Sequence, residues 1–295
     1  MRRTTIQSAL CAGILLWAGA ARGAFEDVEV SPRNRAMGKA YVGMELDAWS
    51  PYHNPAAMAW AGHALVAASY VRPFGYDFSS QSVVSGVVGI GKWGGAGFGI
   101  RRFGTDFRGE DLNSETTFTL AHGFRLFEDA QSAVALGWAL HLYSLDFGTS
   151  VTGIDPGSGT TVGLDLSAQA VVADRTRLGA YALNVNGAAI GDKDREELIR
   201  RVGVGVSYAP YRGVVTLLDI SHEQGEEVQF RGGAEFEVVD FLLLRGGIHS
   251  FPSVVTVGAG FRWRGLSVDY GLSTGGGVLP ETHQFGIQYL FPKGK

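Results

Sequence analysis

Six charged residues in the second half of the chain have the strongest case for a chemical role. Each falls at an alternate position of a short apolar segment, and alternate positions of an extended strand share one face. Both signs of charge are present, which favours paired charges over a binding surface of one sign. We therefore interpret the set as a network of ion pairs that supports the fold, with a path for ions as the alternative. The residues are Arg231, Glu235, Arg245, Arg262, Arg264 and Asp269.

No other group of residues is spaced for catalysis or for metal binding. Residues 89–94 (GIGKWG) match a dinucleotide fingerprint, but no strand–helix–strand unit surrounds them, and glycines in a hairpin turn explain the match. The seven histidines are scattered, and no nucleophile, base and orienting acid can be assembled. A net charge of −4 gives no electrostatic footprint for nucleic acid. We predict no enzymatic activity, no cofactor, no metal and no nucleic-acid partner.

The elements that must position the charges are strands. In residues 132–146, Val134, Leu136, Trp138, Leu140 and Leu142 lie on one face, and small residues with His141 lie on the other. A soluble sandwich also alternates, but here the charged face is rich in glycine, which suits a crowded lumen better than a hydrated surface. The pattern predicts about fourteen strands, an even number as in bacterial single-chain barrels. Their ranges are 64–71, 80–91, 94–103, 114–124, 132–146, 160–173, 176–185, 201–209, 213–222, 226–238, 240–250, 254–264, 265–273 and 282–291.

The connections between these strands support the same fold. Even-numbered connections are mostly short, whereas odd-numbered ones such as 104–113 and 186–200 are longer and more polar. This is the outer-membrane arrangement, with short turns on the periplasmic side. The connection 124–131 breaks the alternation, because it should be short and is not. Since an open sheet edge in lipid leaves backbone groups unpaired, we expect an all-β, closed, transmembrane antiparallel barrel over residues 64–291.

The N-terminal residues have the features of an export signal. Arg2 and Arg3 precede an apolar run at 9–17 and small residues at 18–21. The run is shorter than the roughly 20 apolar residues that a membrane-spanning helix needs. We predict a signal peptide over residues 1–24, cleaved near 20–24. The single cysteine, Cys11, lies inside it, so the mature chain should contain no disulfide.

Residues 25–63 do not alternate and are predicted to form a short helical plug inside the barrel. At Asn54, Pro55 and Ala56 the signal is specific, because Asn is favoured as a helix N-cap and Pro at the first helical position. A short helix can start there and end near Gly62. The alternative is a surface turn before the first strand. Residues 292–295 are expected to form a C-terminal tail.

The chain resembles the PorV/PorQ-type outer-membrane proteins. The resemblance rests on residues 35–40, 47–50 and 54–59, and returns at 178–184, 244–247, 268–271 and 282–285. The same opening is shared in looser form by the FadL long-chain fatty acid transporters. The resemblance implies a fourteen-stranded barrel with a plug that carries the Asn-Pro-Ala motif. The chain departs from it at Ala57 and Met58, where the family usually has Gly-Leu, and after Phe291, where four further residues follow.

Two functions follow from this resemblance. The leading one is a non-enzymatic barrel in the bacterial outer membrane, surrounded by outer-membrane lipid, that binds secretion-machinery or cargo proteins. The alternative is a FadL-like channel for small hydrophobic compounds, in which the plug acts as a gate. An apolar pocket beside residues 54–58 would favour the channel. A filled lumen under an extended outer surface would favour partner binding.

Overall fold

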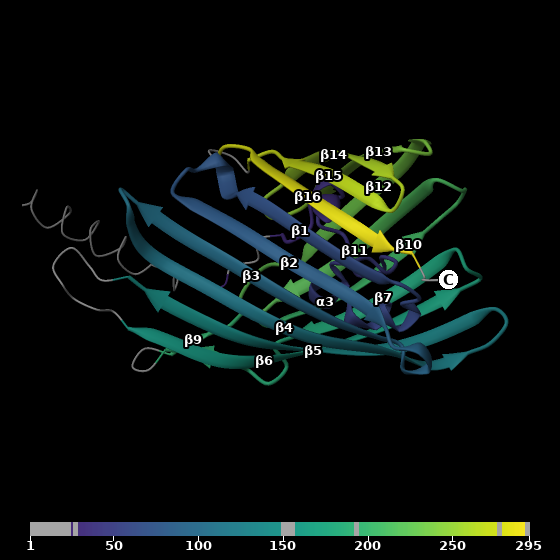
Figure 1. Ribbon diagram of the computed structural model, residues 1–295, viewed down its shortest axis with the longest axis horizontal. Helices are drawn as coiled ribbons and strands as arrows, with labels where there is room; N and C mark the ends of the chain where they lie inside the picture. Colours follow the sequence, from purple (N-terminus) through teal and green to yellow (C-terminus); the bar gives the residue numbers. More distant parts are fainter. Residues whose placement is uncertain (1–24, 26–28, 149–156, 192–194, 276–278, 293–295) are drawn as a thin grey trace, which may run out of the picture.

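The computed structural model describes residues 25, 29–148, 157–191, 195–275 and 279–292. The predicted signal peptide (1–24) and most of the C-terminal tail lie outside these residues. Fourteen antiparallel strands close into one barrel, with β1 paired to β16 (Figure 1). In chain order they are β1 Ala64–Arg72, β2 Ser79–Gly89, β3 Gly95–Phe107, β4 Glu110–Glu128, β5 Ser132–Phe147, β6 Ser158–Val172, β7 Thr176–Leu183, β10 Arg201–Tyr208, β11 Val214–Glu223, β12 Gln229–Val239, β13 Leu242–His249, β14 Val254–Trp263, β15 Leu266–Ser273 and β16 Thr282–Phe291.

All fourteen predicted strands are therefore present. Each pairs with its neighbour in sequence, and the chain closes by the pairing of Ala64 with Phe291 through Arg72 with His283. Closure removes both sheet edges, as an apolar surrounding requires. A separate pair of two-residue strands, β8 Ala189–Ile190 and β9 Glu196–Glu197, lies in the connection after β7. Short helices η2 Pro73–Gly75 and η3 Gly91–Trp93 lie in turns, and the latter occupies the glycine motif that resembled a dinucleotide fingerprint.

The outward face of the barrel changes from apolar to polar between two rows of paired residues. Ile100, Phe118, Leu142 and Val162 form an exposed apolar row across β3 to β6, and each is 43–49% exposed. Two residues further along, the outward positions are Arg102, Thr116, Ser144 and Thr160, again in register. Since outward charges are costly in lipid, the second row marks the edge of the hydrocarbon layer. Strands β3 to β6 continue beyond it, visible as the long strands in Figure 1. We call this part of the strands the outer extension. The end of the barrel that carries it is the outer end, and the opposite end, with the short turns, is the inner end.

Strand pairing explains three differences from the sequence-based expectations, two at the outer end and one at the inner end. Residues 104–113 are not a long loop, because β3 and β4 run on to a tight turn at Arg108 and Gly109. The anomalous connection 124–131 disappears, since β4 continues to Glu128 and absorbs a register shift after Arg125. Phe103 is an aromatic residue at the end of the predicted strand 94–103, a position expected to lie at the lipid interface. It pairs with the buried Gln81 and Glu115 and therefore faces inward.

The segment before β1 lies inside the barrel as the predicted plug (Figure 1). It contains α2 Pro32–Ala36, α3 Ser50–His53 and the 3₁₀ helix η1 Pro55–Trp60. Helix α2 contacts β13 to β16, whereas η1 contacts β2 to β6, so the plug reaches both sides of the lumen. Within the described residues, every helix is too short or too polar to cross a membrane.

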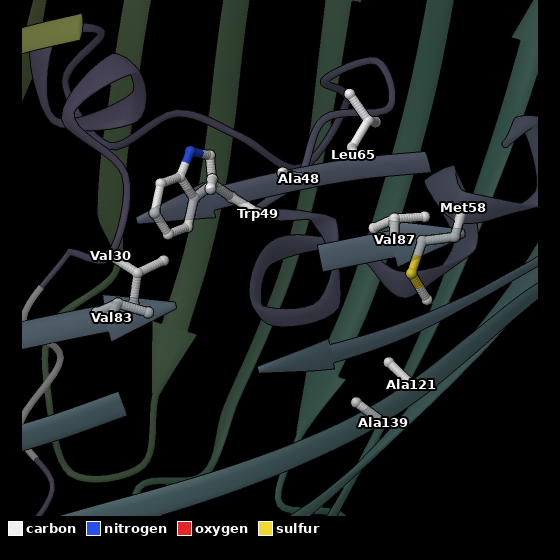
Figure 2. Close-up of a cluster of buried hydrophobic side chains, with 10 residues drawn as sticks. Val30, Ala48, Trp49, Met58, Leu65, Val83, Val87, Ala121 and Ala139 are labelled. Carbon is white, nitrogen blue, oxygen red and sulfur yellow. The ribbon is translucent and has the colours of Figure 1, made fainter. Parts of the chain in front are cut away.

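The largest apolar core joins the plug to the barrel wall. Plug residues Val30, Ala48, Trp49 and Met58 pack against wall residues Leu65, Ala67, Val83, Val87, Ala121 and Ala139 (Figure 2). Trp49 is 3% exposed and Met58 is fully buried. The inner face of the wall carries small residues at many of these positions, and the larger plug side chains fill the space that they leave.

Candidate functional site

The Asn54-Pro55-Ala56 motif forms the start of η1, as its sequence predicts. The Asn54 side chain accepts a hydrogen bond from the Ala56 N–H at 3.1 Å, and Pro55 takes the first helical position. The other end of the Asn54 amide donates to the Val42 carbonyl at 2.7 Å. The Ala56 N–H also donates to Ser167 Oγ on β6 at 2.9 Å. The motif therefore caps a helix and at the same time fixes that helix to the wall.

Glycines in the wall allow the plug backbone to approach closely. A Cβ at Gly137 on β5 would collide with the backbone of Pro55 and Ala56, and one at Gly179 on β7 would collide with Val42. Only glycine leaves room at these two points. The glycine-rich inner face predicted from sequence thus has a specific physical use, because it seats the plug.

Four buried charges connect the plug to the wall on the opposite side of the lumen. Arg33 of α2 donates two hydrogen bonds to Glu235, at 2.9 and 2.8 Å. Arg245 donates to Glu235 and to Asp269, each at 2.6 Å. We call Arg33, Glu235, Arg245 and Asp269 the anchor cluster. Burial lowers the pKa of Arg33, but the carboxylates of Glu235 and Glu45 outweigh it, so that this pKa lies above its ordinary value.

The structure places the other predicted charges at the edge of this cluster or away from it. Arg262 is half-exposed and lies 3.8 Å from Glu235 and 3.7 Å from Glu237. Arg231 is buried on the inner face, where it donates to Gln229 at 2.6 Å. Arg264 does not face the lumen network: it is exposed in the turn after β14, with a positive φ of 46°, and its guanidinium stacks over Trp263 at 5.1 Å. Strand alternation fails there because the strand has already ended.

The sequence did not reveal Arg33, the residue that links this cluster to the plug. Arg33 lies outside the alternating segments, so periodicity could not connect it to Glu235, which is 202 positions away. Its place in the predicted plug segment, residues 25–63, was the only available signal.

Polar wall side chains also bind the plug backbone directly. Asp219 on β11 accepts the N–H groups of Tyr41 and Val42 at 2.6 and 3.0 Å. Thr256 on β14 accepts the Gly38 N–H and donates to the Ala36 carbonyl, each at 2.9 Å. Further bonds reach the plug backbone from Ser69, Ser85, Gln169, Gln284 and Gln288. The plug is therefore held from many strands around the lumen.

A cavity lies between the plug and the outer part of the wall. About 100 Å³ of it is open to the centres of water-sized molecules. We call it the outer cavity. Its lining combines aromatic and aliphatic side chains with a few charged ones, and Leu198 and Phe25 belong to an apolar cluster at its outer side. The aromatic and charged residues of its lining include Phe25, Tyr52, Arg101, His141, Tyr143 and Asp165.

The polar groups of the outer cavity are arranged on neighbouring strands. His141 on β5 lies between Thr119 Oγ1 and Asp165 Oδ2, each 2.9 Å from one of its ring nitrogens. Tyr52 of the plug stacks near the His141 ring, with 6.5 Å between ring centroids, and its hydroxyl lies against Gly99. Burial raises the pKa of Tyr52 to about 12, so the phenol is neutral at physiological pH. The sequence analysis identified His141 as luminal but did not predict this cavity, because its lining comes from six strands, the connection after β7 and the plug.

A second, larger cavity opens at the inner end. About 780 Å³ of this cavity is open to the centres of water-sized molecules. It is lined by Trp49 and Trp60 of the plug together with residues around the turn that contains Gly265. The plug lies between the two cavities. Among the described residues, no group of three histidine, cysteine or carboxylate side chains is placed to hold a metal ion.

Comparison with solved structures identifies the class of fold. The toluene transporter TbuX of Ralstonia pickettii superimposes with a TM-score of 0.59 at 14% identity, over 89% of this chain and 98% of TbuX. The monoaromatic hydrocarbon channel CymD gives a TM-score of 0.62 at 10% identity, over 91% and 99% of the two chains. A FadL homologue of Pseudomonas aeruginosa gives 0.59 at 11% identity, over 90% and 99%. The chain has the fold of FadL-like outer-membrane barrels.

Sequence comparisons add no closer assignment. No protein-family model matches the chain, and no curated protein matches it. The three structures above belong to transporters and channels, or to a FadL homologue, and none is described as a PorV or PorQ protein. The PorV/PorQ part of the resemblance stays a prediction, whereas the FadL-like part agrees with the fold.

Proposed function

We propose that this chain is an outer-membrane channel for the uptake of small hydrophobic compounds. The observation that carries the proposal is the outer cavity, which lies directly against the plug and is lined by rings and aliphatic side chains together with polar and charged groups. Concave, mainly apolar cavities with a few converging polar groups are the usual form of small-molecule sites. The proteins with the same fold include a toluene transporter and a monoaromatic hydrocarbon channel. This supports the channel function over partner binding as the main role.

The anchoring of the plug limits how such a channel can work. Hydrogen bonds from many strands and the anchor cluster hold the plug, so its departure as one body would expose several buried polar groups at once. A compound is therefore expected to pass beside the plug after small local shifts. The compound would occupy the outer cavity first and the inner cavity afterwards.

Uptake by whole cells tests this proposal, because an intact lipopolysaccharide leaflet slows the unassisted entry of apolar molecules. Cells that express the chain should take up labelled toluene several-fold faster than cells with an empty vector. Ile199→Trp, which fills the outer cavity, should reduce the rate towards the empty-vector value. Val202→Trp is the matched control, since Val202 is 55% exposed on the lipid side of the barrel. Equal uptake by expressing and empty-vector cells, with the barrel correctly folded, would contradict the channel function.

Partner binding remains a second candidate because of the outer extension. Strands β3 to β6 present a mainly polar surface beyond the apolar belt, including Arg102, Thr116, Ser144 and Thr160. Such a wall could contact a protein at the cell surface. Cross-linking in cells followed by purification would test it: a specific protein partner that is lost when Arg102 and Ser144 are both replaced by bulky residues would support this role.

A further inference from the structure

Arg101 is a luminal cation that has no carboxylate partner within the part of the chain that the structure describes. It lies on β3, in register with Thr117 of β4, and faces the outer cavity. Its hydrogen bond to Thr117 Oγ1 is long, at 3.5 Å. Among the described residues no carboxylate oxygen lies within 4.0 Å of it, whereas Arg33, Arg201 and Arg245 each have one within 2.8 Å. Burial of a guanidinium without a counter-ion is energetically unfavourable, and proteins rarely retain such a group without a use for it.

The carboxylates around the same cavity are already occupied. Glu115 accepts the Phe25 N–H at 2.8 Å and the Asn113 amide at 3.2 Å. Asp165 accepts from Asn184 N–H at 2.7 Å and contacts His141. Glu29 accepts the Ser31 N–H at 2.9 Å and lies 2.8 Å from His53. These groups cannot turn to Arg101 without abandoning other partners, so the positive charge is left facing the cavity.

Aromatic rings surround the space in front of this charge. Phe25 and Tyr143 meet edge to face, with 4.9 Å between centroids. Tyr52 and His141 stack loosely on the plug side. The faces and edges of these rings favour another aromatic ring in stacked or T-shaped contact. The small volume favours a compact ligand over a long acyl chain.

We infer that the outer cavity binds small aromatic carboxylates, with the carboxylate on Arg101 and the ring among Phe25, Tyr52 and Tyr143. This inference rests on the proposed function and names the substrate class for the same path. A planar guanidinium can hold a carboxylate through two parallel hydrogen bonds. The partial burial of Arg101 strengthens the pair, and the ligand supplies a counter-ion that Arg101 does not find among the described residues.

Fluorine NMR of the purified barrel in lipid nanodiscs tests the inference, with 4-fluorobenzoate, 4-fluorotoluene and hexanoate as probes. The wild-type protein should bind 4-fluorobenzoate, and Arg101→Gln should weaken that binding by about tenfold or more, as expected for loss of a charged hydrogen-bond partner. Arg101→Lys should retain part of the affinity. Arg102→Gln is the matched control, because Arg102 is the next residue on β3 but faces outward. Binding of 4-fluorotoluene should not depend on Arg101.

The outcomes separate this inference from the proposed function. If 4-fluorotoluene binds and toluene uptake proceeds while 4-fluorobenzoate does not bind, the substrate class is wrong and the channel function stands. If hexanoate displaces 4-fluorobenzoate at equal concentration, the aromatic requirement is wrong. If no probe binds and the cell assay also shows no uptake, both the inference and the channel function fail.

Discussion

At the residue scale, Glu235 is a buried carboxylate that joins the plug to the wall. It is 4% exposed and accepts hydrogen bonds from the plug through Arg33 and from the wall through Arg245. Desolvation disfavours any buried charge, but two guanidinium groups and good geometry offset that cost here. Removal of the carboxylate would leave two buried cations facing each other, with Asp269 bound to Arg245 and Glu45 at 3.6 Å from Arg33 as their remaining carboxylate contacts.

We therefore expect Glu235→Ala to lower the free energy of unfolding by about 3–5 kcal/mol, as for other broken buried ion pairs. Urea-induced unfolding in liposomes, followed by tryptophan fluorescence, measures this quantity. Glu237→Ala is the control on the same strand, since Glu237 is half-exposed and its contact with Arg262 is 3.7 Å long. It should cost only about 0–1 kcal/mol. Equal effects of the two substitutions would show that the anchor cluster does not stabilise the plug.

At the scale of the elements, large side chains of the plug pack against small residues of the wall. The plug supplies large side chains such as Trp49 and Met58, and the wall supplies glycine and alanine where the plug backbone comes closest. The short helices of the plug would not be stable alone, because helices of a few residues are marginal in water. Their conformation depends on capping by Asn54 and on the wall that surrounds them.

Gly137→Leu should displace η1, because the new side chain would occupy the position of Pro55 and Ala56. We expect the barrel to remain folded but to conduct ions in planar bilayers more strongly than the wild type, since the lumen would no longer be filled. Gly246→Leu is the control: Gly246 is on the outward face of β13, and a Cβ there meets no atom closer than 3.9 Å. Unchanged conductance of Gly137→Leu, with both variants folded, would argue that the plug does not block the lumen.

At the scale of the whole molecule, the barrel is defined by a belt of exposed apolar residues. On β5 this belt runs from Val134 to Leu142 and ends at Ser144. Exposed apolar side chains of this extent are unfavourable in water and are stable only against lipid. The polar row that begins at Ser144 and the outer extension beyond it lie outside the hydrocarbon layer.

The position of the belt predicts how strongly an outward-facing arginine destabilises the barrel at different points along β5. Leu140→Arg should lower the free energy of unfolding from lipid by about 2 kcal/mol, between the values for the midplane and the interface. Ser144→Arg, four residues further along the same outward face, should lower it by less than about 1 kcal/mol. Unfolding titrations in liposomes of fixed composition compare the two. The opposite order would place the membrane boundary elsewhere.

The sequence by itself determined the strands, their number and, except in 83–90 and 214–221 where alternation is weak, the face that a strand turns to lipid, because alternation with a period of two is a local property of an extended chain. It also determined the helix start at Asn54 and Pro55, for which capping chemistry is local too. It misjudged 104–113, 124–131, Phe103 and Arg264, where strands run further than predicted or have already ended, since strand ends depend on pairing with a neighbour.

Only the tertiary structure decided which charges meet. Arg33 reaches Glu235, and Arg101 meets no carboxylate of the described residues, because barrel closure brings the plug and distant strands around one lumen. The outer cavity has the same origin, as its lining is assembled from the plug and several strands. Contacts between residues far apart in sequence leave no periodic trace in the sequence, and they form only when the barrel closes around the plug.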